Sequence, residues 1–251
     1  MLKMTLSSAT DTGRQRYKNE DRHFAEFLSD RFIAAAVIDG CGGHAAGDVC
    51  AELTADTLLD GLRARLEMNG TLSTEALREA LIEANNHIVN YKNASFRFGD
   101  MACVASAVVV DIQSGSASTA HIGDTRVYLA SNAGITKLTP DHSPVGRLLD
   151  AGIISEAEAM RHPGRNRIDR AIGIAHLDAD THHVFTCTTP VAPGDTIVLC
   201  SDGLYDEIIS HDILATINNP DIPRDAIAPT LVSLANEAGG HDNITVVTIS
   251  L

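Results

Sequence analysis

Two consecutive segments in the first half of the chain carry apolar residues along one helical face. In each segment these residues are three or four positions apart, which is the spacing of an amphipathic helix. The first segment contains Ala51, Ala55, Leu58, Leu62 and Leu66, and the second contains Leu77, Leu81, Ala84, Ile88 and Tyr91. Ser73 precedes the second segment, where its hydroxyl can cap a helix. The pattern therefore predicts two helices in succession.

Short apolar runs bounded by turns predict strands elsewhere. Residues 31–39 read "RFIAAAVID", a buried strand that follows a hairpin-like N-terminal region. Further strands are expected at 103–112, 116–122, 126–131, 135–138, 183–188, 196–201 and 244–249. A segment with Pro and His, residues 140–170, interrupts them, and a helical stretch follows residue 201. No repeat or Pro/Ser linker divides the chain, so residues 1–251 are interpreted as one domain.

The order of these elements indicates the fold class. Two helices come together, and the strands after them are joined by turns too short for crossovers. Short connections are typical of antiparallel pairs, whereas parallel strands need a long crossover. We therefore expect an α+β fold in which helices cover antiparallel sheets.

Composition and charge exclude several classes of protein. The 251 residues have a formal net charge of −14, which disfavours nucleic acid as a partner. The longest apolar stretches, such as 102–110, fall short of the ~20 residues of a membrane span. No signal peptide is recognisable, and the five cysteines form no C-x-x-C pair. We expect a cytoplasmic protein with reduced thiols that binds neither nucleic acid nor membrane.

The stretch "VIDGCGGHA", residues 37–45, places a carboxylate beside three glycines. Gly40, Gly42 and Ala45 fit a variant of the dinucleotide-binding fingerprint, and Asp39 equally suits a metal ion. A dinucleotide fold needs alternating strands and helices, which this chain lacks, and a carboxylate at position 39 would repel a pyrophosphate. The metal interpretation is therefore preferred.

Acids stand at strand ends in four further segments. Each lies in a different part of the chain: "RYKNEDRHF" with Glu20 and Asp21, "HIGDTRVYL" with Asp124, "TIVLCSDGL" with Asp202, and "HDNITVVTI" with Asp242. A lone Asp-Gly pair is ordinary turn chemistry. If several such ends converge, however, their carboxylates cannot all stay ionised without a cation. Oxygen ligands select a hard ion, magnesium or manganese rather than zinc.

These motifs resemble those of the metal-dependent type 2C protein phosphatases, the PPM class. "GRQRYKNED", "VIDGCGGH", "HIGDTRVYL", "SDGLYDEI" and "GGHDNITVV" occur in the family's order, from about residue 10 to residue 251. The resemblance implies an α-β-β-α sandwich of two antiparallel sheets flanked by helices, with a binuclear metal site at one edge. It also implies a bacterial-type catalytic domain with a flap at about 140–170.

The resemblance assigns a role to each motif residue. Asp39 would bridge two ions, Mn²⁺ or Mg²⁺, and the Gly40 carbonyl would bind one of them. Asp202 and Asp242 would hold the first ion, Glu20 would serve the second through water, and Asp21 would accept hydrogen bonds behind them. Asp124 matches the aspartate of a third ion, whose occupancy stays open. Arg16 would grip the substrate phosphate, so Arg16, Asp39 and Asp202 are the residues expected to carry catalysis.

The implied activity is hydrolysis of phosphoserine and phosphothreonine in proteins, by direct attack of a water that bridges the ions. The implied partners are phosphorylated proteins and a cognate Ser/Thr kinase in a signalling pathway. The cysteine-phosphatase pattern C-x5-R is absent, and "DLDADTHH" does not fit the aspartyl-phosphate motif. The alternative is a pseudophosphatase that binds phosphoproteins without turnover. Such proteins usually lose a metal carboxylate, and none is missing here.

Three positions depart from the family pattern or leave a role open. Cys41 stands where many members carry a histidine that protonates the leaving group. "DMACVAS" replaces a usual Gly-Thr-Thr run. His44 matches a family histidine for which we favour a structural hydrogen bond.

Overall fold

The computed structural model describes residues 4–41, 46–94 and 100–251, which form two five-stranded antiparallel sheets. The strands of the first sheet are β1 (Thr5–Asp11), β6 (Arg126–Ser131), β7 (Gly134–Lys137), β9 (Thr196–Cys200) and β10 (Ile244–Ser250). The strands of the second sheet are β2 (Arg22–Phe27), β3 (Phe32–Cys41), β4 (Ala102–Asp111), β5 (Ser116–Ile122) and β8 (Phe185–Pro190). The strand orders are β1-β10-β9-β6-β7 and β2-β3-β4-β5-β8.

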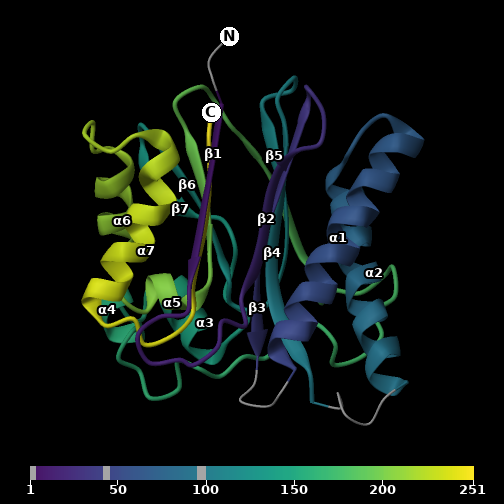
Figure 1. Ribbon diagram of the computed structural model, residues 1–251, viewed down its shortest axis with the longest axis horizontal. Coiled ribbons are helices and arrows are strands. Elements are labelled where there is room, and N and C mark those ends of the chain that lie inside the picture. The colour runs from purple at the N-terminus through teal and green to yellow at the C-terminus, as the bar shows by residue number, and fades with distance from the viewer. Residues whose placement is uncertain (1–3, 42–45, 95–99) are drawn as a thin grey trace.

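Helices cover the outer face of each sheet, and the two sheets pack against each other (Figure 1). The second sheet is covered by α1 (Gly47–Asn69) and α2 (Thr74–Asn93). The first sheet is covered by α5 (Asp202–Tyr205), α6 (Ser210–Ile217) and α7 (Ile227–Ala238), with the short 3-10 helix η2 (Arg224–Ala226). Two short helices, α3 (Pro144–Asp150) and α4 (Glu156–Ala159), lie between β7 and β8. The expected α-β-β-α sandwich is confirmed.

The sequence pattern of the helices is borne out by their packing. Leu58 and Leu62 of α1 and Leu77 and Leu81 of α2 are fully buried against the second sheet. The Ser73 hydroxyl accepts a hydrogen bond from the backbone N–H of Ala76 and caps α2 as expected. No helix among the described residues is long and apolar enough to cross a membrane.

Strand β3 is apolar on both faces because it lies between the helices and the other sheet. Ile33, Ala35 and Val37 pack in the core between the sheets, and the residues between them pack under the helices. Successive side chains of a strand point to opposite faces. Asp39 continues the series that faces the other sheet, and it stands at the end of the strand. The period of the strand therefore places this carboxylate between the two sheets, at the edge opposite the chain termini (Figure 1).

The hairpin expected at the N-terminus is wrong. β1 pairs with β10 in one sheet, whereas β2 pairs with β3 in the other. An alternating run predicts a strand but does not identify its partner, and here the partner of β1 is the last strand of the chain. Residues 12–21 consequently cross from one sheet to the other, and they carry Arg16 and Glu20 along the same edge as Asp39.

Candidate active site

A cavity of about 270 Å³ opens between the sheets at this edge. All the predicted site residues except Asp21 line it: Arg16, Glu20, Asp39, Gly40, Asp124, Asp202 and Asp242. Its wall is completed by Cys41, Val104, Asn166, Ile168 and Asn243. Five segments that are far apart in sequence thus meet at one place, as the strand-end pattern indicated.

Gly40 stands where no side chain fits. A Cβ atom at this position would lie 2.5 Å from the carbonyl carbon and oxygen of Gly47 and 2.8 Å from the carbonyl oxygen of Glu20. Residue 40 therefore has to be glycine for the first turn of α1 and the segment carrying Glu20 to approach β3 this closely. The same close packing fixes Asp39, which is paired with Val104 across β3 and β4.

Asn243 anchors the crossing segment to the start of β10. Its Nδ2 donates to the carbonyl oxygens of Thr12 and Lys18, at 2.9 Å each, and its Oδ1 accepts from the N–H of Glu20 at 2.8 Å. These three bonds hold the loop that carries Arg16 and Glu20 beside Asp242. Asn243 therefore acts on the site through the backbone of this loop.

Asp21 lies beneath the cavity and is only 3% exposed. Its Oδ2 accepts a hydrogen bond from the Ser201 hydroxyl at 2.8 Å, whereas its Oδ1 has no hydrogen-bond partner among the described residues. Burial raises the pKa of this carboxyl to about 6. Its position behind the cavity agrees with the supporting role expected for it, which remains a prediction.

The carboxyls in the cavity strongly perturb one another. Asp39 and Asp202 keep some contact with solvent, but they lie deep between the sheets, and burial raises the pKa of both far above the usual range. The neighbouring acids raise these pKa values further: Asp21, Asp124 and Asp242 act on Asp39, and Asp242, Asp124 and Asp206 act on Asp202. Burial and the charge of Asp141 raise the pKa of Asp124 to about 7. Because these carboxyls lie close together at one edge, each disfavours the ionisation of the others unless a cation binds among them.

The donor set fits a hard divalent ion. The acids that converge are all oxygen ligands, and the Gly40 backbone adds a carbonyl, which is the chemistry that magnesium and manganese prefer. Within residues 4–41, 46–94 and 100–251, no three Asp, Glu, His or Cys side chains already surround one point closely enough to hold an ion. The carboxylates would have to come closer together to bind an ion.

A family comparison decides what kind of protein carries this cavity. Residues 12–238 match the family model described as protein phosphatase 2C. The chain belongs to the protein phosphatase 2C family. The family resemblance is thereby confirmed, and the matched range contains four of the five motifs, with Arg16, Glu20, Asp39, Asp124 and Asp202. Asp242 lies just beyond the range.

Named relatives of this phosphatase family cover nearly the whole chain. This chain is 34% identical over 245 residues to the serine/threonine phosphatase stp of Listeria monocytogenes, and the match covers 96% of this chain and 93% of that protein. The crystal structure of the Mycobacterium tuberculosis serine/threonine phosphatase PstP/Ppp superimposes with a TM-score of 0.82 at 31% identity, covering 99% of this chain and 98% of that one. A structure of the PstP catalytic domain in complex with two manganese ions gives a TM-score of 0.79 at 29% identity, over 98% and 97% of the two chains.

One acid that the sequence analysis did not single out acts on this site from outside the cavity. Asp206 is the C-cap residue of α5, four residues after Asp202, so both carboxyls share a helical face. Burial raises the pKa of Asp206 to about 6, and its charge raises the pKa of Asp124 and of Asp202. Its carboxylate accepts from Arg165 Nε at 3.2 Å. The spacing in "DGLYD" was the available signal.

The segment 140–170 contributes directly to the cavity. Asn166 and Ile168 line it beside the acids, and Arg165 reaches Asp206. Cys41 also lines it, and its Sγ lies 3.8 Å from the Asp39 carbonyl oxygen. Gly42, Gly43 and His44 fall outside the described residues, so the hydrogen bond expected of His44 stays a prediction.

Proposed function

We propose that this chain is a metal-dependent phosphoprotein phosphatase that hydrolyses phosphoserine and phosphothreonine. One observation carries the proposal: acids from five separate segments and one arginine line the same cavity between the sheets. The family match and the relatives named serine/threonine phosphatase support the class of reaction. None of the acids that the family motifs require is missing, which favours catalysis over a pseudophosphatase.

The residues of this chain divide the work by their chemistry. Asp39, Asp202, Asp242 and the Gly40 carbonyl would hold divalent ions, two per chain, with Glu20 acting through water, Asp21 supporting them from behind, and Asp124 serving a third ion. When bound, manganese or magnesium ions lower the pKa of water and stabilise negative charge on a phosphoryl group. Arg16 would bind two oxygens of the phosphate through its planar guanidinium.

The surroundings of the cavity suggest how a substrate is received. We propose that residues 1–251 act as one catalytic unit and that the flap, residues 140–170, contacts the substrate, since Asn166 and Ile168 already line the cavity. The substrates would be phosphoproteins made by a cognate Ser/Thr kinase. We place the protein in the cytoplasm, and the absence of disulfides among the described cysteines agrees with that compartment.

The decisive experiment is a metal-restoration assay on a phosphothreonine peptide. Protein stripped with a chelator should be inactive, and manganese should restore turnover, because all the proposed ligands are oxygen atoms. Asp202→Asn should remain inactive at saturating manganese. Asp56→Asn, at an exposed position of α1 away from the cavity, is the matched control and should behave as the wild type.

Two results would contradict the proposal. Turnover in excess chelator, with metal content confirmed as nil, would exclude the metal-dependent mechanism. Manganese binding detected by calorimetry without hydrolysis of phosphopeptides or p-nitrophenyl phosphate would favour the pseudophosphatase instead.

A further inference from the structure

The turn that carries Asp124 is tightly packed between β5 and β6. Gly123 has a φ of +109°, and a Cβ there would lie 2.1 Å from Val104 Cγ1. Asp124 itself is only 8% exposed, although it lines the active-site cavity. The direction of its carboxyl therefore depends on how the backbone of this turn is held.

Two residues from distant segments hold the turn. Tyr205 of α5 donates its hydroxyl to the Asp124 carbonyl oxygen at 3.0 Å. His142 bonds Gly123 twice: its backbone N–H donates to the Gly123 carbonyl oxygen at 2.7 Å, and its Nδ1 accepts from the Gly123 N–H at 3.0 Å. The turn is thus fixed from the first helical turn after β9 and from the beginning of the flap.

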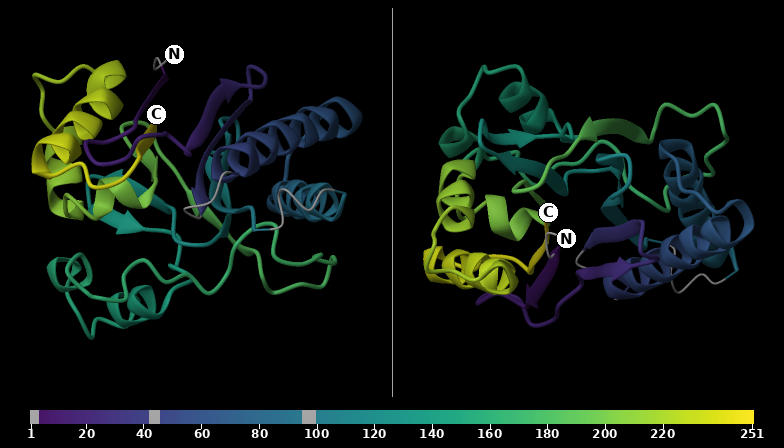
Figure 2. Two further views of the ribbon diagram at one scale, coloured as in Figure 1. Left: turned by 60° about the horizontal axis from the view of Figure 1, so that its bottom comes forward. Right: turned by 90° about the horizontal axis from the view of Figure 1, so that it is seen from above.

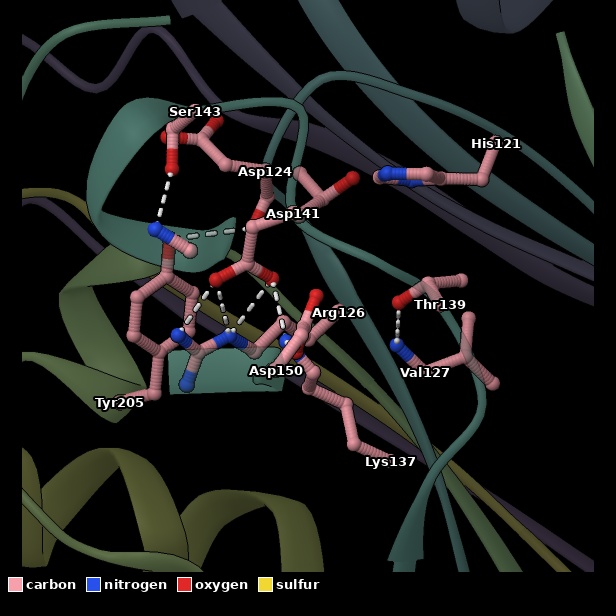
Figure 3. Close-up of polar contacts among 12 residues, drawn as sticks. His121, Asp124, Arg126, Val127, Lys137, Thr139, Asp141, Ser143, Asp150 and Tyr205 are labelled. Carbon is pink, nitrogen blue, oxygen red and sulfur yellow. Dashed lines mark hydrogen bonds and ion pairs between the residues drawn. The ribbon is translucent and has the colours of Figure 1, made fainter. Parts of the chain in front are cut away.

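The buried guanidinium of Arg126 contacts Tyr205 directly and reaches His142 through the neighbouring residue Asp141. Arg126 Cζ lies 3.5 Å from the centre of the Tyr205 ring, which is the geometry of a cation–π contact. Arg126 also forms a two-pronged ion pair with Asp141, the residue before His142, at 3.0 Å from Nε to Oδ1 and 2.7 Å from Nη2 to Oδ2 (Figure 3). Arg126 and Asp141 are 5% and 4% exposed. Arg126 therefore contacts Tyr205 and Asp141, which belong to the two segments that bond to the turn of Asp124.

Two further charges, of which Asp150 is exposed, extend this network towards the surface. Lys137 Nζ lies 3.0 Å from Asp141 Oδ1 and 2.5 Å from Asp150 Oδ1, so the two acids face two bases (Figure 3). Arg126 Nη1 also donates to the Tyr128 hydroxyl at 3.1 Å, a contact on the side of the arginine that does not reach the turn. Desolvation offsets much of the attraction within a buried ion pair, so the Arg126–Asp141 pair is weak evidence for stabilisation of the fold.

We propose that Arg126 is a positioning residue for the Asp124 carboxylate, acting through Tyr205 and through the Asp141–His142 pair. The inference rests on the proposed function in one respect, that Asp124 binds a divalent ion. Its physical basis is preorganisation: a ligand held by its backbone does not have to be ordered when the ion arrives. Because Asp141 and His142 begin the flap, the same arginine links the flap to the metal site.

The test compares two tyrosine variants by calorimetric titration of the chelator-stripped protein with Mn²⁺, without substrate. The Asp124-dependent binding step is defined as the step that Asp124→Asn removes. Tyr205→Phe keeps the ring on Arg126 and deletes only the bond to the turn, so this step should weaken roughly threefold to tenfold. Tyr128→Phe deletes the other tyrosine hydroxyl at Arg126 and should leave the step at the wild-type affinity.

Two further variants test whether the change in Mn²⁺ affinity depends on Arg126 and on Asp124. Arg126→Lys keeps the charge but loses the bidentate pair with Asp141 and the stacking on the Tyr205 ring. It should therefore weaken Mn²⁺ binding in the Asp124-dependent step at least as much as Tyr205→Phe. Adding Tyr205→Phe to Asp124→Asn should change the remaining Mn²⁺ binding no further, since the two substitutions act on one group. In turnover assays, Tyr205→Phe should need more manganese for half-activation and keep its kcat at saturation.

The inference is overturned if Tyr205→Phe binds Mn²⁺ like the wild type, if Tyr128→Phe weakens the step equally, or if Asp124→Asn removes no binding step. A wild-type affinity in Tyr205→Phe overturns the inference even if Arg126→Lys does not fold. Failure of the proposed function would be seen separately, as wild-type protein that binds Mn²⁺ without hydrolysing a phosphothreonine peptide. The ranking of the variants by Mn²⁺ affinity, measured by calorimetry, is independent of that result.

Discussion

Arg16 Nη2 lies 2.6 Å from Asp242 Oδ2, so the arginine expected to bind phosphate is paired with an acid expected to bind metal. Both side chains are partly exposed, at 47% and 30%. An ion pair in such a position contributes little to stability and is readily exchanged for other partners. The crossing segment of residues 12–21 runs along the bottom edge of the sandwich, which faces forward in Figure 2 (left). This segment carries Arg16 to Asp242. The pair thus places Arg16 at the cavity while leaving it free to turn to a phosphate.

Replacing Arg16 by alanine should impair substrate binding and leave metal binding intact. The substitution removes the guanidinium that would form charged hydrogen bonds with the substrate phosphate. It should therefore lower kcat/KM on a phosphothreonine peptide by about a hundredfold. Manganese affinity should stay the same or increase slightly, because Asp242 loses a competing cation. Arg14→Ala is the matched control, since Arg14 bonds the Asn236 carbonyl oxygen and does not line the cavity. A large loss of manganese affinity, with kcat/KM restored by extra manganese, would assign Arg16 to the metal site instead.

Asp39→Asn and Asp202→Asn should each abolish turnover without loosening the fold. Burial and neighbouring acids raise the pKa of both carboxyls, so each ionised side chain destabilises the metal-free protein. An amide of the same shape removes that repulsion, and the melting temperature in chelator should be unchanged or higher. The measurements are thermal melts in chelator and kcat at saturating manganese. A kcat near that of the wild type in either variant would remove that residue from the catalytic centre.

The metal-free protein should lose stability as pH rises from about 6.5 to 8.5. Burial, followed by the charge of Asp141, raises the pKa of Asp124 to about 7, above the ~3.9 of an unfolded aspartate. The folded state then holds the proton more tightly, so the stabilisation present at low pH is lost as pH passes through 7. His121 and His142 have pKa values lowered by burial to about 4 and 3 and act with the opposite sign, but only below about 6.5.

Thermal melts in chelator across this pH range provide the measurement. Asp124→Asn should flatten the decline, because the amide does not titrate. Saturating manganese should reverse the sign, since metal ligands bind as deprotonated groups. A melting temperature in chelator that rises between pH 6.5 and 8.5 would mean that these carboxyls are ionised in the folded protein without a metal.

The sequence predicted the site because each expected ligand follows or precedes an apolar strand. Alternation along β3 places Asp39 on the same face as Ile33, Ala35 and Val37, so a pattern with a period of two was enough to put the carboxylate between the sheets. The same reasoning reached Asp202 and Asp242, which flank β9 and β10. Local pattern and motif spacing were sufficient wherever the chemistry lay at a strand end.

The missing parts depend on contacts between distant segments. The pairing of β1 with β10 joins the two ends of the chain, and no local alternation encodes it. Arg126 likewise reads as an ordinary strand residue, because Asp141 and Tyr205 meet it only after the flap and α5 have packed. Asp206 was within reach, since a four-residue spacing after Asp202 would have indicated a shared helical face.

Cys41 is expected to take no part in proton transfer, although it lines the cavity where many family members carry a histidine. Burial raises the pKa of its thiol well above the usual range, and the charges of Asp39 and Asp124 raise it further. Such a thiol donates its proton poorly, and a nearby divalent ion would bind the thiolate rather than help return the proton. Water should supply the proton to the leaving group instead.

Cys41→Ala should therefore stay within about tenfold of the wild type, below the ~10²–10⁴-fold that general acid catalysis contributes. The comparison uses a phosphothreonine peptide, whose alkoxide needs a proton, and p-nitrophenyl phosphate, whose leaving group needs none. Cys187→Ala, a half-buried thiol on β8 that does not line the cavity, is the matched control. A hundredfold loss on the peptide alone, with manganese affinity unchanged, would show that the thiol is the acid, because only protonation of the leaving group separates the two substrates.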